Sequence, residues 1–198
     1  FITSFFYPVK GGVETQIYEL SNELIKKGHE VEVFTSDLLR DGKIKKYHEN
    51  IDGIKVRRFK TWFRIGDFGS FFPGVFKAVK TSDSDIIHIH GYRHPHNFLV
   101  LFTKKPCLLT LHWPNYPKGL RKAWLDLLVN MFDKIFGHYL LNKYDKLIAV
   151  NKLEIPWIKS FRIKEKIWFQ KNYNLFFAKN PRMEIFIQTL IFSAPGCF

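Results

Sequence analysis

The chain has 198 residues, of which 46% are hydrophobic, and carries 31 Lys and Arg against 18 Asp and Glu, for a formal net charge of +13. The length suits one large domain or one and a half small ones, and no apolar run approaches the ~20 residues that a membrane-spanning helix needs. Such a charge favours anionic partners (nucleotides, acidic lipid surfaces or nucleic acid), although a lysine-rich solvated surface explains it equally well.

The cysteines indicate a reducing compartment. Cys107 and Cys197 lie far apart and lack metal-ligand spacing, and Cys107 precedes an apolar run, as is typical of a buried small hydrophobe. The N-terminus shows no basic region followed by an apolar stretch, so we expect no signal peptide. These features predict a cytoplasmic protein.

The first 36 residues predict a strand, a glycine loop, a helix and a second strand. Residues 1–7 are aromatic and β-branched, and Pro8 ends this strand. Helical spacing then follows at Val13, Ile17, Leu20 and Leu24. Gly28 ends the helix, and residues 31–35 form the next strand. A unit of this size implies parallel pairing with a right-handed crossover.

Strands and helices alternate through the rest of the chain. Further strands are expected at 54–59, 85–91, 107–112, 147–150 and 167–169, and helices from Pro73, at about 95–102, at 120–141 and after Asn151, where Glu154 completes a capping-box pattern. Residues 37–53 and 66–74 are expected as loops, with turn signals at Asp41-Gly42 and Asp52-Gly53. The pattern predicts an α/β fold with a doubly wound parallel sheet, in which ligands bind beyond the carboxyl ends of the strands.

The Gly11-Gly12 loop precedes the first helix. Glycines there let the backbone approach a ligand, and the N–H groups of a helix N-terminus suit a phosphate, although a tight turn without ligand explains the pair too. The loop is not a GxGxxG fingerprint, and Thr35-Ser36 rather than an acidic residue ends the second strand, so NAD binding is not expected. No GxxxxGK[ST] occurs, which excludes a P-loop.

Histidines gather at two predicted strand ends. His88, His90, His94 and His96 fall within nine residues, but no cysteine or carboxylate cluster completes a metal shell. We expect His88 in the core and His90 in the cleft. His112 ends a buried strand, where it is either a satisfied core residue or a donor to a sugar hydroxyl or phosphate.

Together these residues resemble the family 4 retaining glycosyltransferases of the GT-B type. The matching pieces are Phe6-Tyr7-Pro8, Gly11-Gly12-Val13-Glu14, Leu20, Leu24, Gly28-His29-Glu30-Val31, Asp85-Ile86-Ile87-His88-Ile89-His90, Thr110-Leu111-His112, and Asp145-Lys146-Leu147-Ile148-Ala149-Val150-Asn151 with Glu154. The resemblance implies a Rossmann-like domain that binds the acceptor, facing a second domain that holds the nucleotide-sugar. It implies transfer with retention of anomeric configuration, and no metal or other cofactor.

The resemblance also implies site residues. Gly11 and Gly12 would face the donor diphosphate, and His112 would be the catalytic histidine near the transferred sugar. The residues implied on the acceptor side are Tyr7, Lys10, His90, Tyr92 and Lys118. Backbone amides and basic groups would stabilise the leaving diphosphate.

The resemblance covers residues 1–168, whereas residues 169–198 form a divergent tail and the family's second domain is absent. We therefore expect a truncated acceptor-side half that is inactive alone, and open apolar patches that favour self-association or a separate C-terminal half. The alternative is a non-catalytic Rossmann module that binds a glycan, a lipid or a partner. Nucleic acid is not an expected partner, because the lysines are spread along the chain without a known motif. Lipid-linked acceptors at an anionic membrane would suit the charge.

Overall fold

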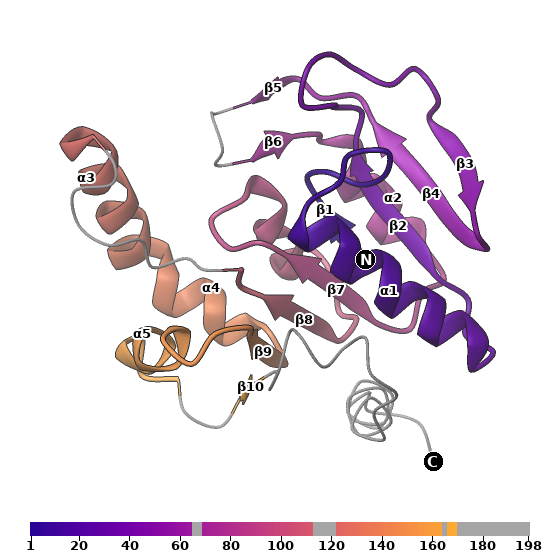
Figure 1. The fold of residues 1–198 in the computed structure, drawn as a ribbon. Helices are drawn as coiled ribbons and strands as arrows, with labels where there is room; N and C mark the ends of the chain where they lie inside the picture. Colours follow the sequence, from indigo (N-terminus) through magenta and orange to yellow (C-terminus); the bar gives the residue numbers. More distant parts are fainter. Residues whose placement is uncertain (65–68, 113–121, 164–165, 170–198) are drawn as a thin grey trace.

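The computed structural model describes residues 1–64, 69–112, 122–163 and 166–169. Its centre is an eight-stranded sheet with the strand order β10-β9-β8-β7-β1-β2-β4-β3 (Figure 1). Every neighbouring pair is parallel except β3 and β4. The strands are β1 (Ile2–Thr3), β2 (Glu32–Ser36), β3 (His48–Ile51), β4 (Ile54–Phe59), β7 (Ile87–His90), β8 (Cys107–Thr110), β9 (Lys146–Ala149) and β10 (Ile167–Phe169). The predicted doubly wound, Rossmann-like α/β fold is confirmed.

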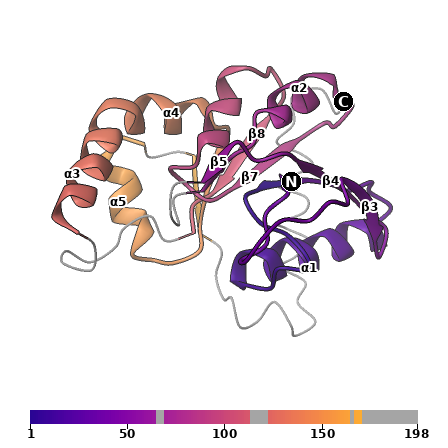
Figure 2. The same cartoon turned by 90° about the horizontal axis from the view of Figure 1, so that it is seen from above.

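Helices cover both faces of the sheet, as Figure 2 shows for α1 and α2. They are α1 (Gly12–Lys26), α2 (Gly74–Thr81), the 3₁₀ helix η1 (Pro95–Leu101), α3 (Ala123–Phe132), the π-helical turn η2 (Asp133–Gly137), α4 (His138–Lys143) and α5 (Glu154–Ser160). Side chains alternate between the two faces. Val33 belongs to the core beneath α1, whereas its neighbour Phe34 belongs to the larger core on the other face. This alternation follows from the two-residue period of a strand.

The predicted βαβ unit is present. Ile17 and Leu20 of α1 are fully buried, and the helix is followed by Gly28, whose φ of 88° is the left-handed conformation that glycine adopts readily. The first strand is shorter than expected, because only Ile2 and Thr3 pair with the flanking strands. The next residues therefore form a loop that leads from the sheet to the glycine turn.

Two hairpins each have one strand, β3 or β6 (Ser70–Phe71), in a segment that the sequence predicts as a loop. Strand β3 pairs with β4 across the Asp52-Gly53 turn, where both residues have positive φ, as a tight hairpin requires. Strands β5 (Phe63–Arg64) and β6 (Ser70–Phe71) form a separate two-stranded sheet. Beyond β6, Phe72 is 1% exposed and joins the larger core. The loop prediction is therefore wrong for β3 and β6, where strand pairing satisfies the backbone hydrogen bonds of segments that are polar or rich in glycine.

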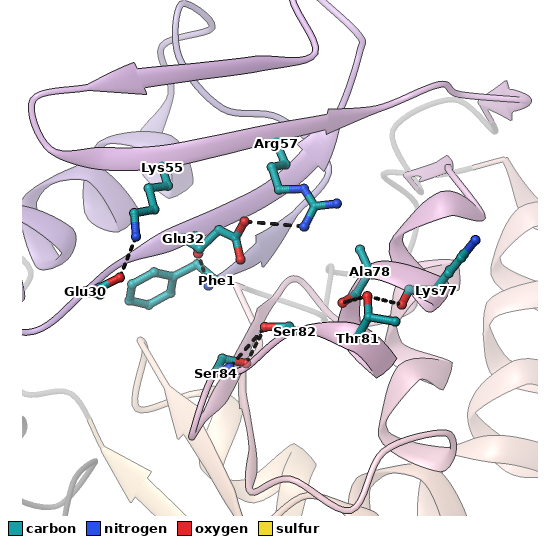
Figure 3. A network of polar contacts seen from close by, with 10 residues as sticks. All are labelled: Phe1, Glu30, Glu32, Lys55, Arg57, Lys77, Ala78, Thr81, Ser82 and Ser84. Atoms are coloured by element: carbon teal, nitrogen blue, oxygen red, sulfur yellow. Dashed lines mark hydrogen bonds and ion pairs between the residues drawn. The ribbon is translucent and has the colours of Figure 1, made fainter.

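One exposed and one half-buried ion pair join β4 to β2 and the turn before it. Lys55 Nζ lies 2.5 Å from Glu30 Oε2, and Arg57 Nη1 lies 3.6 Å from Glu32 Oε1 (Figure 3). A solvent-exposed pair such as Lys55–Glu30 contributes about 0–1 kcal/mol. The buried core, rather than these charges, stabilises the sheet.

The expected helix at 120–141 is a continuous helical segment over the described residues 123–143, with the π-turn η2 between α3 and α4. Its residues Trp124, Leu127, Leu128, Met131, Ile135 and Tyr139, which we call the apolar face of α3–α4, are 46–69% exposed. Among the helices of the described residues, none is both long and apolar enough to cross a membrane. The other side of the α3–α4 segment packs in the protein, where Val129, Leu140 and Leu141 are buried.

Candidate functional site

Neighbouring strands β1, β7 and β8 end at the same edge of the sheet, because they run parallel. The register pairs Ile2 with Ile89 and His90 with Thr110. Just past these ends, Ser4 Oγ lies 3.2 Å from Nδ1 of His94, a contact between residues 90 positions apart. The carboxyl edge thus brings the loop after β1 against the loop after β7, at the position where ligands bind in doubly wound sheets.

Five histidines occupy this region. His90 Nδ1 lies 2.9 Å from His112 Nε2, and the ring centroids of His88 and His90 are 4.3 Å apart. His94 and His96 stack with centroids 5.1 Å apart and planes 9° apart. His88 Nε2 lies 2.7 Å from Thr110 Oγ1. Within the part of the chain that the structure describes, no group of three His, Cys, Asp or Glu side chains could hold a metal ion. The expectation of a metal-free site stays a prediction.

These histidines are neutral at physiological pH. Burial lowers the pKa of His88 and of His90 well below the ordinary value of 6.5. Burial likewise lowers the pKa of His94 to about 4, that of His96 to about 3 and that of His112 to about 3. A neutral imidazole has one N–H donor and one lone-pair acceptor, so the chemistry of each ring depends on its tautomer.

His112 has a special backbone conformation. Its φ of 56° lies in the left-handed region, which is uncommon for a residue with a side chain. The preceding residue is held on both sides: Leu111 donates its N–H to Ile148 O at 3.2 Å, and its carbonyl accepts from Tyr92 N at 3.2 Å. Non-glycine residues with positive φ persist where the surrounding structure fixes them, and they gather at functional sites.

The loop after β7 is tightly built. Gly91 has a φ of 87°, and a Cβ there would lie 2.6 Å from the His94 ring. Asn97 Nδ2 donates to the Gly91 carbonyl at 2.9 Å, and the Asn97 side chain also accepts from the backbone of His94. Any larger residue at Gly91 would displace His94 from the carboxyl edge.

The glycine loop is partly filled by the protein itself. A Cβ on Gly11 would lie 2.4 Å from Glu14 Oε2, whereas a Cβ on Gly12 would meet nothing within 4 Å. Burial raises the pKa of Glu14, opposed by a hydrogen bond from its own backbone N–H and by the charge of Arg40. Arg40 Nη2 also donates to the Lys10 carbonyl at 3.1 Å. The carboxylate of Glu14 thus uses part of the helix N-terminus, while Gly12 is open to a ligand.

The other predicted site residues are dispersed. Tyr7 is half-buried, with its ring centroid 4.7 Å from that of Tyr18, and Lys10 is exposed. His90 is 1% exposed and contacts His112, and Tyr92 is 6% exposed and packs edge-on against Trp157. Lys118 lies outside the described residues. The structure therefore joins His90 to His112 and places Tyr92 in the core.

The carboxyl edge holds residues that the sequence analysis did not select. Ser4 and His94 meet there, and Arg40 and Glu14 lie at the glycine loop. Ser4 and His94 each follow the end of a strand, which is the signal that could have selected them from the sequence. Their contact with each other depends on the order of the strands in the sheet. Arg40 lies in a polar loop and carries no local signal.

The domain is Rossmann-like, has an open glycine turn before its first helix and carries neutral histidines at the carboxyl edge of its sheet. This combination is typical of glycosyltransferase-type domains of the GT-B kind. The sequence model described as Glycosyltransferase Family 4 matches residues 10–170, and the chain belongs to this family. The resemblance inferred from the sequence motifs is confirmed.

Two similar proteins extend this comparison. The gpi3 subunit of phosphatidylinositol N-acetylglucosaminyltransferase from Schizosaccharomyces pombe is 33% identical over 93 residues, which are 46% of this chain and 20% of that protein. A solved structure of sucrose-phosphate synthase from Thermosynechococcus elongatus matches with a TM-score of 0.59 at 13% identity, over 96% of this chain and 99% of that one. The first match spans about a fifth of the relative's length, and the second shows the fold.

Proposed function

We propose that these 198 residues are the acceptor-binding half of a retaining glycosyltransferase, and that by themselves they transfer little or no sugar. The observation that carries this proposal is the position of His112 at the carboxyl edge of a family 4 domain, where its Nε2 lies 2.9 Å from His90 Nδ1. The relative's name makes N-acetylglucosamine the first sugar to test and phosphatidylinositol the first acceptor. We propose that a C-terminal half of the GT-B type holds the nucleotide-sugar.

In this mechanism the chain orients groups and stabilises charge. His112 donates its single N–H to a hydroxyl of the transferred sugar, and its low pKa keeps it neutral while it does so. The Gly12 backbone lets the donor diphosphate approach the N-terminus of α1, where N–H groups and the helix dipole favour the charge that develops on the leaving group. For the acceptor side we propose Tyr7 and Lys10, together with Lys118, which lies outside the described residues. No metal or other cofactor takes part in the proposal.

Gly12→Ala tests the phosphate site. The added methyl group has open space, so thermal stability should be unchanged, but it would obstruct the close backbone approach of a phosphate. We expect binding of UDP-N-acetylglucosamine or inositol phosphate, followed by ¹⁵N chemical shifts, to weaken about tenfold or more, which is the loss of one hydrogen bond to a charged group. Thr81→Ala, at an exposed position of α2, is the control. Equal binding by both variants and the wild type would contradict the proposal and show that Gly11-Gly12 is a turn without a role in phosphate binding.

Measurement of enzymatic turnover distinguishes the proposed glycosyltransferase half from a non-catalytic binding module. Sugar transfer by the isolated chain at ~1 s⁻¹, an ordinary enzyme rate, would contradict inactivity alone. Robust binding of glycan or phospholipid, with no turnover after addition of any donor-binding half, would favour a non-catalytic binding module instead.

We also propose that the apolar face of α3–α4 contacts an anionic membrane surface, where lipid-linked acceptors are found. Trp124 and Tyr139 lie on this face, and aromatic side chains with a polar tip suit the membrane interface. Lys134 and Lys143 are exposed on the same helical segment and Lys122 is exposed just before it, which suits acidic lipid headgroups. Lys143 Nζ lies 5.2 Å from the Tyr139 ring centroid, so charge and apolar surface are adjacent.

Vesicle sedimentation tests this contact. The double variant Trp124→Ser/Met131→Ser should bind phosphatidylserine vesicles about tenfold more weakly than the wild type, since it removes two large apolar side chains from the face. Trp62→Ser is the matched control, because Trp62 is 70% exposed but lies outside this face. Dimerisation through α3–α4 without vesicle binding would contradict the proposal and identify a second copy as the occupant.

A further inference from the structure

The His90–His112 contact requires one proton between two nitrogens. Nδ1 of His90 and Nε2 of His112 are 2.9 Å apart, within hydrogen-bond distance. Both rings are neutral at physiological pH, because burial lowers both pKa values. One nitrogen of the pair must therefore carry the hydrogen and the other must accept it.

The second nitrogen of His90 decides which arrangement holds. Nε2 of His90 is buried and has no hydrogen-bond partner among the described residues. If that nitrogen carried the proton, a buried N–H would remain without an acceptor, which is rarer in proteins than an under-used acceptor. The proton of His90 therefore belongs on Nδ1, and His112 Nε2 accepts it. Neutral His112 must then carry its own proton on Nδ1.

His90 is held firmly enough to impose this choice. It is 1% exposed in a four-residue strand that is buried throughout. Its ring packs against the rings of His88, at 4.3 Å between centroids, and of His112, at 5.2 Å and 28°. The backbone N–H of Gly91, the next residue, donates to Thr110 O at 2.9 Å, which aligns the ends of β7 and β8. The donor thus sits on a rigid element, as a positioning group requires.

We propose that His90 is a positioning residue whose Nδ1–H bond to Nε2 fixes the ring orientation and the Nδ1–H tautomer of His112. The tautomer that histidine favours in water is the other one, with the proton on Nε2. His90 therefore selects which nitrogen of His112 donates to a ligand, in the same way that outer groups fix the tautomer of catalytic and metal-binding histidines. The tautomer follows from the protein alone, whereas its use in sugar transfer rests on the proposed function.

Imidazole ¹⁵N NMR of the full chain at pH 7.5 tests the proposal without any ligand. His112 signals are assigned by their loss in His112→Gln. We expect the wild type to show His112 Nδ1 protonated and Nε2 unprotonated. His90→Leu, which keeps an apolar side chain but removes the donor, should shift the tautomer ratio about fivefold toward Nε2–H, the effect of one ordinary hydrogen bond. His90→Asn carries an amide N–H near the position of Nδ1 and should retain the wild-type tautomer.

Two results would overturn the proposed role of His90. A wild-type His112 protonated on Nε2 would overturn the proposal, even if His90→Leu does not fold. An unchanged tautomer in a folded His90→Leu would overturn it as well. Failure to bind any nucleotide-sugar or acceptor would contradict the proposed function and leave the tautomer result intact, so the two failures are distinguishable.

Discussion

Lowering the pH from 7.5 to 5 should unfold the domain. Five histidines at the carboxyl edge have pKa values lowered by burial: His88, His90, His94, His96 and His112. In the unfolded chain each regains a pKa near 6.5 and binds a proton as the pH falls through that value, while the folded state does not. The unfolded state then holds more protons, so acidification favours it.

The size of this effect is comparable to the whole stability of a domain. Below pH 6.5, and until the folded pKa is reached, each such group lowers the free energy of unfolding by about 1.4 kcal/mol per pH unit. For His94 that window extends to about pH 4, and for His96 and His112 to about pH 3. The raised pKa of Glu14 acts in the opposite direction, but one group cannot offset five. Native domains have only about 5–15 kcal/mol to lose.

Urea denaturation at a series of pH values measures this linkage. His96→Gln should reduce the pH slope by about one proton, or about 1.4 kcal/mol per pH unit. The amide can still reach the His90 carbonyl, which lies 3.3 Å from His96 Nε2, but it does not titrate. His48→Gln, at an exposed position in β3, should leave the slope unchanged. A stability that is flat between pH 7.5 and 5 would contradict the burial of these imidazoles as neutral groups.

Arg93→Leu should destabilise the fold by about 3–5 kcal/mol, because it leaves a buried carboxylate without its cation. The Arg93 guanidinium donates to Asp133 twice, from Nε to Oδ1 at 2.9 Å and from Nη2 to Oδ2 at 2.6 Å. The two side chains are only 8% and 13% exposed. The pair connects the loop after β7 to η2, so its loss should also loosen the segment that carries the apolar face of α3–α4.

Two controls distinguish the buried charge from lost packing. The double variant Arg93→Leu/Asp133→Leu should recover much of the stability, since replacing both partners of a buried pair leaves no isolated charge. Lys55→Met breaks the exposed pair with Glu30 and should cost less than about 1 kcal/mol. If Arg93→Leu is no worse than Lys55→Met in urea denaturation at pH 7.5, then Asp133 is effectively solvated and this interpretation is wrong.

The local pattern predicted much of this fold. The βαβ unit and the strands at the sheet centre follow from spacing and turn residues close together in the chain. The predicted capping box at Asn151 is not formed, because α5 begins at Glu154 with Leu153 as its N-cap, and Glu154 instead accepts from Val150 N at 2.9 Å. The sequence analysis missed strand β3. Its signal is present in the sequence, since Asp52-Gly53 is a tight-hairpin dipeptide between two alternating segments. Its polar side chains concealed a strand at the exposed end of the sheet order.

The family, the βαβ unit, the central strands and the glycine turn before α1 follow from the sequence, because they depend on residues near one another in the chain. Which side chains meet depends on the tertiary structure. His90 reaches His112 over 22 positions, and Ser4 reaches His94 over 90, through the order of parallel strands in the sheet. The same packing placed Tyr92 in the core and left Trp124 60% exposed. Helical or strand periodicity can group residues on one face, but it does not specify what that face meets.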